Sequence, residues 1–158
     1  MRRTSRWGGI VVATALLLGS GIAPGVAQDK LAVIKQRQDF MKAQGGDVKA
    51  VTAFVKGQGD QAAAEKAAED LVSRSLQIPD LFVAGTSSAD FPGKTYAKPA
   101  IWQNMDKVKA ISTTLHDEEV KLAAAIKGGD RTAAGAALGT AGRDGCGACH
   151  GEFREKMP

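Results

Sequence analysis

The chain has 158 residues, a length typical of one domain, and a formal net charge of +4 at neutral pH. Three of its 21 basic residues lie within the first six positions, so the rest of the chain carries 18 basic against 17 acidic side chains. This near balance excludes the clustered positive charge of a nucleic-acid-binding domain, and we expect no nucleic acid as a partner.

The N-terminal segment has the pattern of a cleaved secretory signal. It opens with three arginines, Arg2, Arg3 and Arg6. An apolar run over 10–18 follows, and small residues at 25–27 supply a cleavage site. An uncleaved anchor is the alternative, but the run is shorter than the ~20 residues that a membrane span needs. We therefore predict a signal peptide over 1–27 and an exported, soluble domain over 28–158 with no stable membrane insertion.

The rest of the chain favours helices, because it is rich in Ala, Lys, Glu and Gln and lacks a convincing period-two pattern. The first helix is expected to begin near Asp29. Its inward face is marked by residues three or four apart: Leu31, Ile34, Gln38 and Met41, then Val48, Val51, Phe54 and Val55. Gly45-Gly46 lies between the two runs and predicts a kink or a one-turn break, since each glycine costs about 1 kcal/mol relative to alanine.

A second helix is predicted after the turn at Gly57-Gln58-Gly59. Asp60 is its expected N-cap, and it runs to about Leu76, before Pro79. Its expected inward residues are Ala64, Ala67, Leu71 and Leu76. A long irregular connection over 80–98 follows, and such loops are uncommon in compact domains unless they have a role.

Two further helices complete the pattern. Pro99 suits the first turn of the third, whose apolar stripe is Ile101, Met105, Val108, Ile111, Leu115, Leu122 and Ile126. Gly128-Gly129 ends that helix, and Asp130 caps a fourth helix that extends to about Lys156. The first turns of the fourth helix are rich in alanine and glycine, which allows close approach. Four helices with short first and third connections predict an all-α, antiparallel up-down-up-down four-helix bundle.

The fourth helix contains Cys146-Gly147-Ala148-Cys149-His150, the C-x-x-C-H motif of c-type haem attachment. Positions i and i+3 of a helix share a face, so both sulfurs can reach one porphyrin edge while the adjacent imidazole binds the iron. A thiol–disulfide oxidoreductase is disfavoured, because no βαβ pattern surrounds the motif. The sequence shows no phosphate loop, paired carboxylates or activated hydroxyl. We predict one covalent haem c, no catalytic residues, and a connection over 80–98 that covers one edge of the cofactor.

Three stretches resemble the class II cytochromes c, the family of cytochromes c' and c-556. They are Arg37-Gln38-Asp39-Phe40-Met41-Lys42, Lys98-Pro99-Ala100-Ile101-Trp102, and the C-x-x-C-H motif with Phe153-Arg154. The resemblance implies a haem-bearing four-helix bundle in the periplasm that exchanges electrons with redox partner proteins and is not an enzyme. It also implies dimerisation through the first two helices, as in many members, and disfavours a full break at Gly45-Gly46.

The resemblance further implies roles for individual residues. Those at the haem would be Cys146, Cys149, Arg37, Gln38, Trp102 and Arg154. Arg37 and Gln38 would lie near the haem edge and its propionates, although an ordinary solvated Arg37 is the alternative. His150 would be the proximal iron ligand, and Met41 falls where low-spin members place a sulfur ligand.

Met41 decides between two functions. A thioether on iron raises the reduction potential and suits an electron carrier, which is the expected case. If Met41 only fills the core, the alternative is a five-coordinate haem protein that binds NO or CO. Met105 is expected to pack in the core, and His116 to be an exposed helical residue. Glu118-Glu119 and Lys121 are expected on a solvated face.

Overall fold

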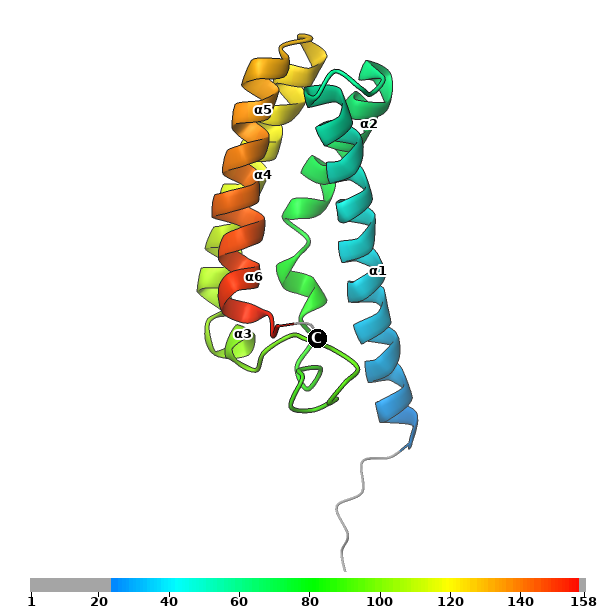
Figure 1. The fold of residues 1–158 in the computed structure, drawn as a ribbon. Coiled ribbons are helices and arrows are strands. Elements are labelled where there is room, and N and C mark those ends of the chain that lie inside the picture. The colour runs from blue at the N-terminus through cyan, green and yellow to red at the C-terminus, as the bar shows by residue number, and fades with distance from the viewer. Residues whose placement is uncertain (1–23, 157–158) are drawn as a thin grey trace, which may run out of the picture.

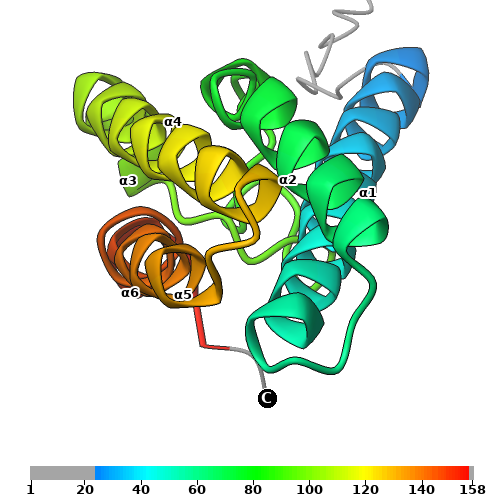
Figure 2. The same ribbon diagram turned by 90° about the horizontal axis from the view of Figure 1, so that it is seen from above.

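The computed structural model describes residues 24–156, so most of the predicted signal lies outside the described residues and stays a prediction. The helices are α1 (Pro24–Val55), α2 (Gln61–Ser75), the one-turn η1 (Pro79–Leu81), α3 (Ala100–Gln103), α4 (Met105–Lys127), α5 (Arg131–Thr140), the π-helical η2 (Ala141–Gly147) and α6 (Ala148–Phe153). The last three run on as one helix (Figure 1). Seen from above, α1, α2, α4 and α5–α6 form the four members of an antiparallel bundle (Figure 2), which confirms the predicted fold class. Within 24–156, no helix is both long and apolar enough to cross a bilayer.

α1 is continuous through Gly45-Gly46, so the predicted kink or break is wrong. The helix also begins at Pro24, earlier than the predicted Asp29. Each half of α1 packs against the rest of the protein through its own buried residue, Ile34 before the glycines and Val51 after them. Tertiary packing of this kind outweighs the roughly 1 kcal/mol that each glycine costs a helix.

One end of the bundle holds a continuous apolar core, here called the upper core. Its buried residues are Val51, Phe54, Ala64, Ala67, Ala68, Leu71, Leu122, Ile126, Ala134 and Ala137. The alanines allow close packing of α2 and α5 on their neighbours. The predicted caps hold this end together: the carboxylates of Asp60 and Asp130 accept hydrogen bonds from the amides of Ala63 and Ala133, both at 2.9 Å.

The inward faces of α1 and α2 differ from the prediction by about one position. Leu31 and Gln38 are exposed on α1, and Arg37 is buried instead. On α2, Ser75 is buried while Leu76 is 52% exposed. In both helices the three-to-four spacing leads to a buried polar residue, Arg37 on α1 and Ser75 on α2, while the neighbours Gln38 and Leu76 are exposed. Polar residues occupy these positions because hydrogen-bond partners are within reach of their side chains.

The inward stripe of α4 also contains polar residues that the sequence analysis missed. The predicted Val108, Leu115, Leu122 and Ile126 are buried, whereas Met105 and Ile111 are half-buried. The same spacing places Ser112 and Glu119 in the stripe, and Glu119 is only 3% exposed. The assignment of Glu119 to a solvated face is therefore wrong. Its neighbour Glu118 does pair with Lys121 near the surface, at 2.5 Å.

The fourth helix widens to π-helical geometry over η2, just where the haem motif begins. This segment lies against α4: a Cβ added at Gly145 would come within 2.7–2.8 Å of side-chain atoms of Leu115 and 3.2 Å of its Cα. Only a glycine permits this approach. The helix then ends at Phe153, earlier than the predicted Lys156, because Arg154 leaves it to form a β-bridge with Ala97. Single π-turns of this kind often mark functional sites.

Gly145→Ala should destabilise the protein by about 1–3 kcal/mol, because the new methyl group would press on the backbone and side chain of Leu115. The matched control is Gly142→Ala in the same π-helical segment, where a Cβ would meet nothing within 4 Å. We expect the control to be neutral or slightly stabilising. Thermal unfolding of the haem-loaded proteins measures both changes, and equal midpoints for the two variants would contradict the close approach.

Glu119 should make stability fall as pH rises. Burial raises the pKa of this carboxyl to about 7, and the Ser75 hydroxyl offsets part of the rise. Between pH values of about 4.5 and 7, the folded state then holds a proton that the unfolded state has lost. The free energy of unfolding should therefore drop by up to about 3 kcal/mol as the pH rises across this range. Glu119→Gln should remove the drop, and Glu118→Gln should keep it. Denaturant titrations at a series of pH values measure the free energy of unfolding. If it depended on pH in Glu119→Gln as it does in the wild type, Glu119 would not be the group responsible.

Candidate haem site

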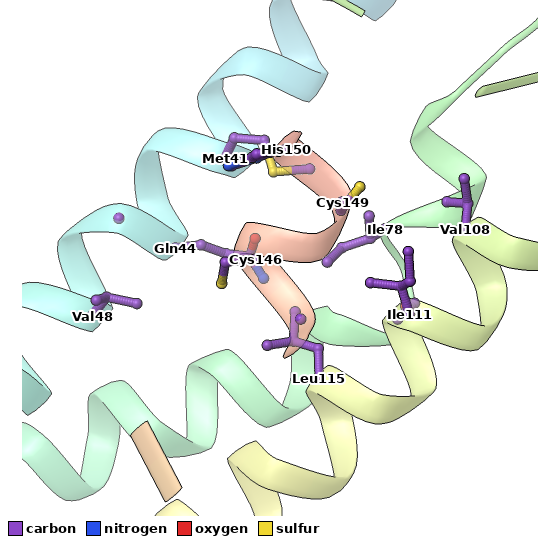
Figure 3. A pocket seen from close by; sticks show the side chains of 13 residues that line it. Met41, Gln44, Val48, Ile78, Val108, Ile111, Leu115, Cys146, Cys149 and His150 are labelled. Carbon is purple, nitrogen blue, oxygen red and sulfur yellow. The ribbon is translucent and has the colours of Figure 1, made fainter. Parts of the chain in front are cut away.

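A cavity of about 170 Å³ lies below the upper core, between α1, α4 and the segment that carries C-x-x-C-H. Its lining residues are Met41, Gln44, Gly45, Val48, Ile78, Val108, Ile111, Ser112, Leu115, Gly145, Cys146, Cys149 and His150. Met41, Gln44 and Val48 approach from α1, and Val108, Ile111 and Leu115 from α4, with the helical motif between them (Figure 3). The structure thus gathers the motif and the predicted sulfur ligand around one largely apolar space.

The two cysteines line this cavity as free, half-buried thiols. Burial raises the pKa of the Cys146 thiol, and the negative charge of Glu119 adds to the rise. The pKa of Cys149 is raised by burial first, and then by Cys146 and Glu152. Thiol–disulfide oxidoreductases instead lower the pKa of their attacking cysteine, so these thiols do not suit disulfide exchange.

His150 follows Cys149 on α6 and lines the cavity while one side stays exposed. The surrounding protein lowers the pKa of its imidazole, first by desolvation and second through the positive charge of Arg154. Both effects favour the neutral imidazole, which is the form that binds a metal. Arg154 lies beside His150 in the chain fold, as its backbone N–H donates to the His150 carbonyl at 3.3 Å.

Met41 is half-buried and brings a thioether to the same cavity. It packs with Cys146 against a buried cluster of Ile78, Leu115 and Ala141. Met105 behaves differently: it packs in a second cluster around Ile101, Val108 and Phe153, and it does not line the cavity. The described methionine that shares the cavity with His150 is therefore the one on α1.

Arg37 and Gln38 lie beside the site and do not line the cavity. Arg37 is 4% exposed, so the alternative of a solvated residue is wrong. Its guanidinium donates to the Leu81 carbonyl at 3.2 Å, to the Thr86 hydroxyl and carbonyl at 2.9 Å, and to the Thr95 hydroxyl at 3.0 Å. Gln38 is exposed and donates to the Lys94 carbonyl at 2.8 Å. Both side chains hold the 80–98 connection against α1, and their contact with a haem propionate stays a prediction.

Trp102, which the resemblance places at the haem, packs in the core and does not line the cavity, so its contact with the haem stays a prediction. Its Nε1 donates to the Phe82 carbonyl at 2.8 Å, and the two rings meet edge to face at 6.1 Å. His116 was expected to be exposed, which is wrong. It is half-buried, with Nδ1 3.0 Å from the Ser75 hydroxyl and 3.2 Å from the Val72 carbonyl.

Sequence reasoning missed several residues of the cavity wall, namely Gln44, Gly45, Ile78, Ser112 and Gly145. Two of them follow from helical spacing, because Gln44 is three residues after Met41 and Ser112 is four after Val108. Ile78 and Gly145 carry no such signal. Ile78 lies after the end of α2, and Gly145 lies in the π-helical segment η2. Their positions depend on tertiary packing.

The residues of the cavity fit a haem. Two thiols at i and i+3, a neutral imidazole and a facing thioether form a donor set suited to covalent attachment and iron ligation, and the remaining wall is mostly apolar. The wall includes the exposed Gly45 and His150, so the cavity reaches the surface there. A flat group larger than the enclosed volume can therefore be held with part of its edge in solvent.

Comparison with known proteins agrees with this geometry. The family model described as Cytochrome C' matches residues 32–154. A cytochrome c' of Pararhodospirillum photometricum is 36% identical over 125 residues, which are 78% of this chain and 97% of that protein. A cytochrome c-556 of Agrobacterium tumefaciens (strain II Chrys) is 35% identical, with the same coverage.

Among solved structures, a nitric oxide complex of a variant of cytochrome c prime from Alcaligenes xylosoxidans matches with a TM-score of 0.69 and 30% identity. The match covers 81% of this chain and 97% of that one. The family model spans most of this chain, and nearly the full length of each of these relatives is matched. The chain therefore belongs to the cytochrome c' family, whose members carry one covalently bound haem c.

Proposed function

We propose that this protein is an electron carrier whose haem is attached through Cys146 and Cys149 and ligated by His150 and Met41. The observation that carries the proposal is that all four side chains line the same cavity. The haem supplies the one-electron redox chemistry, and the chain supplies attachment, axial ligation and a largely apolar enclosure.

Each of these contributions favours electron transfer. A thioether opposite an imidazole stabilises ferrous iron and raises the reduction potential. The apolar wall around Ile78, Ile111 and Leu115 limits the water that could compete for the iron. Met41 and His150 are each carried by a helix of the bundle, which would hold both side chains in place toward a bound haem.

Arg37 extends this proposal to the haem propionates. Its guanidinium is buried among neutral oxygens, and it forms no ion pair with any described carboxylate. Burial accordingly lowers its pKa, which is the sign of a cation that the polypeptide does not balance. A propionate near Arg37 would supply the missing negative charge.

The location and partners follow from the same proposal. The signal-like N-terminus and the haem motif point to export and to a periplasmic site of action, with redox proteins as partners. We also propose that two copies can associate through α1 and α2, as the family resemblance implies.

Binding of NO is the second candidate function. It is favoured by the solved relative that was obtained as a nitric oxide complex. Met41 decides here too, because a thioether that leaves the iron, or never reaches it, would open the sixth position to a diatomic ligand.

Met41→Ala tests the choice between these two functions. The wild-type protein should be low spin in both oxidation states and should bind CO slowly, because sulfur occupies the sixth position. The variant should be high spin and bind CO readily. Met105→Ala is the matched control: it removes a methionine that does not line the cavity, so its spectrum should stay low spin. Visible and electron paramagnetic resonance spectra provide the readout, and a high-spin wild type that Met41→Ala leaves unchanged would sink the ligand assignment.

Cys146→Ser and Cys149→Ser test the attachment. Either change leaves one thioether and should weaken maturation, and the double change should abolish covalent haem. Denaturation followed by acid–organic extraction and mass measurement separates the cases. Free haem recovered from matured wild-type protein would overturn the assignment.

A further inference from the structure

Glu119 is a buried acid that the haem site does not use. It lies on α4 one turn beyond Leu115, which lines the cavity, and one turn before Leu122, which belongs to the upper core. Its side chain is 3% exposed, and its Oε2 has no hydrogen-bond partner among the described residues. An acid at such a position is costly unless its charge is balanced or its proton is retained.

No cation among the described residues balances this carboxyl. On α4, the cation Lys121 is paired with Glu118. On η2, the cation Arg143 is paired with Asp144 at 2.8 Å. On α2, the cation Arg74 is paired with Asp47 of α1. On α5, the upper core contains the uncharged Ala137. The groups left near Glu119 are the Cys146 thiol, the Ser75 hydroxyl and, one turn away on α4, His116.

The carboxyl lies near the haem attachment point, because Cys146 packs against the buried cluster that includes Leu115, one turn before Glu119 on α4. After burial, the negative charge of Glu119 is the main cause that raises the pKa of the Cys146 thiol. A charge that acts on this sulfur would also act on a haem bonded to it, since charges inside a protein are screened less than in water.

Two polar side chains near Glu119, Ser75 and His116, have groups that can pass protons. The Ser75 hydroxyl lowers the pKa of the carboxyl, and it is 3.0 Å from Nδ1 of His116. His116 is half-buried, so part of this residue is in contact with solvent. A hydroxyl both donates and accepts hydrogen bonds, and so does an imidazole with one protonated nitrogen, so the pair can relay a proton.

We propose that Glu119 is a proton-binding site coupled to the oxidation state of the haem, an inference that rests on the proposed electron-carrier function. When a one-electron donor protein reduces ferric to ferrous iron, the haem centre loses one positive charge. The carboxylate of Glu119 then takes up one proton from solvent and becomes a neutral acid, and oxidation releases that proton. The carrier would thus move one electron together with up to one proton.

Spectroelectrochemical titration of the haem-loaded protein over a range of pH tests this directly. The wild-type reduction potential should fall as pH rises through neutrality, and each tenfold difference in proton affinity between the two oxidation states corresponds to about 59 mV. Glu119→Gln should match the wild type in acid, where the carboxyl is neutral in both states. It should rise above the wild type as pH increases, because it cannot become anionic.

Glu118→Gln is the matched control, since it removes the adjacent acid, which pairs with Lys121, and should follow the wild type at every pH. A second readout needs no variant. Redox-difference infrared spectra of wild-type protein labelled with ¹³C-glutamate should show a glutamic acid carbonyl band that appears on reduction. An identical pH dependence in wild type and Glu119→Gln, or the absence of this band, would overturn the proposal.

Failure of the carrier function would look different. A haem that cannot be reduced and reoxidised reversibly would refute electron carriage by this site, and a haem that is high spin with Met41 intact would refute ligation by Met41. A reversible, low-spin haem whose potential is independent of pH would leave the carrier intact and refute only the role of Glu119.

Discussion

The apolar cavity between α1, α4 and the C-x-x-C-H segment is the constraint on which the rest of this structure depends. A wall of apolar side chains around an unfilled space forfeits dispersion contacts. Without a bound group, the apolar side chains around this cavity of about 170 Å³ would face water, at a cost of about 25 cal/mol per Å² of apolar surface. The upper core can pack without a ligand, but the lower half of the bundle needs a flat apolar group, and the covalent haem of this family is such a group.

Small residues create the room for that group. Gly145 lets the π-helical turn of η2 lie directly on Leu115, and this contact fixes the start of the haem motif against α4. Gly45 keeps the opposite wall free of a side chain without bending α1. The glycine that looked like a helix breaker thus forms part of the cavity wall within an intact helix. Helix propensity and cavity shape impose opposite demands at this position, and packing at both ends of α1 decides between them.

The sequence predicted the parts of the fold that rest on local chemistry. Asp60 and Asp130 cap their helices because the capping interaction spans three residues, and the C-x-x-C-H spacing identifies its cofactor because both thiols must reach one ring. Prediction from the sequence failed where packing between residues far apart in the chain determines which side chains are buried. Ser75 replaces Leu76 in the interior because helical phase outweighs hydrophobicity there. Glu119 appeared to belong with the charged Glu118 and Lys121, and only the continuation of the stripe from Leu115 to Leu122 shows it to be inside.

Two buried charges of opposite sign give the site a polarity that the polypeptide alone does not neutralise. Arg37 is surrounded by neutral oxygens at the 80–98 connection, and Glu119 sits between the cavity and the upper core without a cation. Within a folded domain, such charges persist only when something balances them or when protonation removes them. A haem presents both kinds of partner, anionic propionates at one edge and a formally cationic ferric centre. If a haem is bound here, Arg37 would balance its propionates, and Glu119 would respond to the charge of the iron. Of the two residues, only Glu119 would then experience a charge that changes with oxidation state, because the propionates keep theirs.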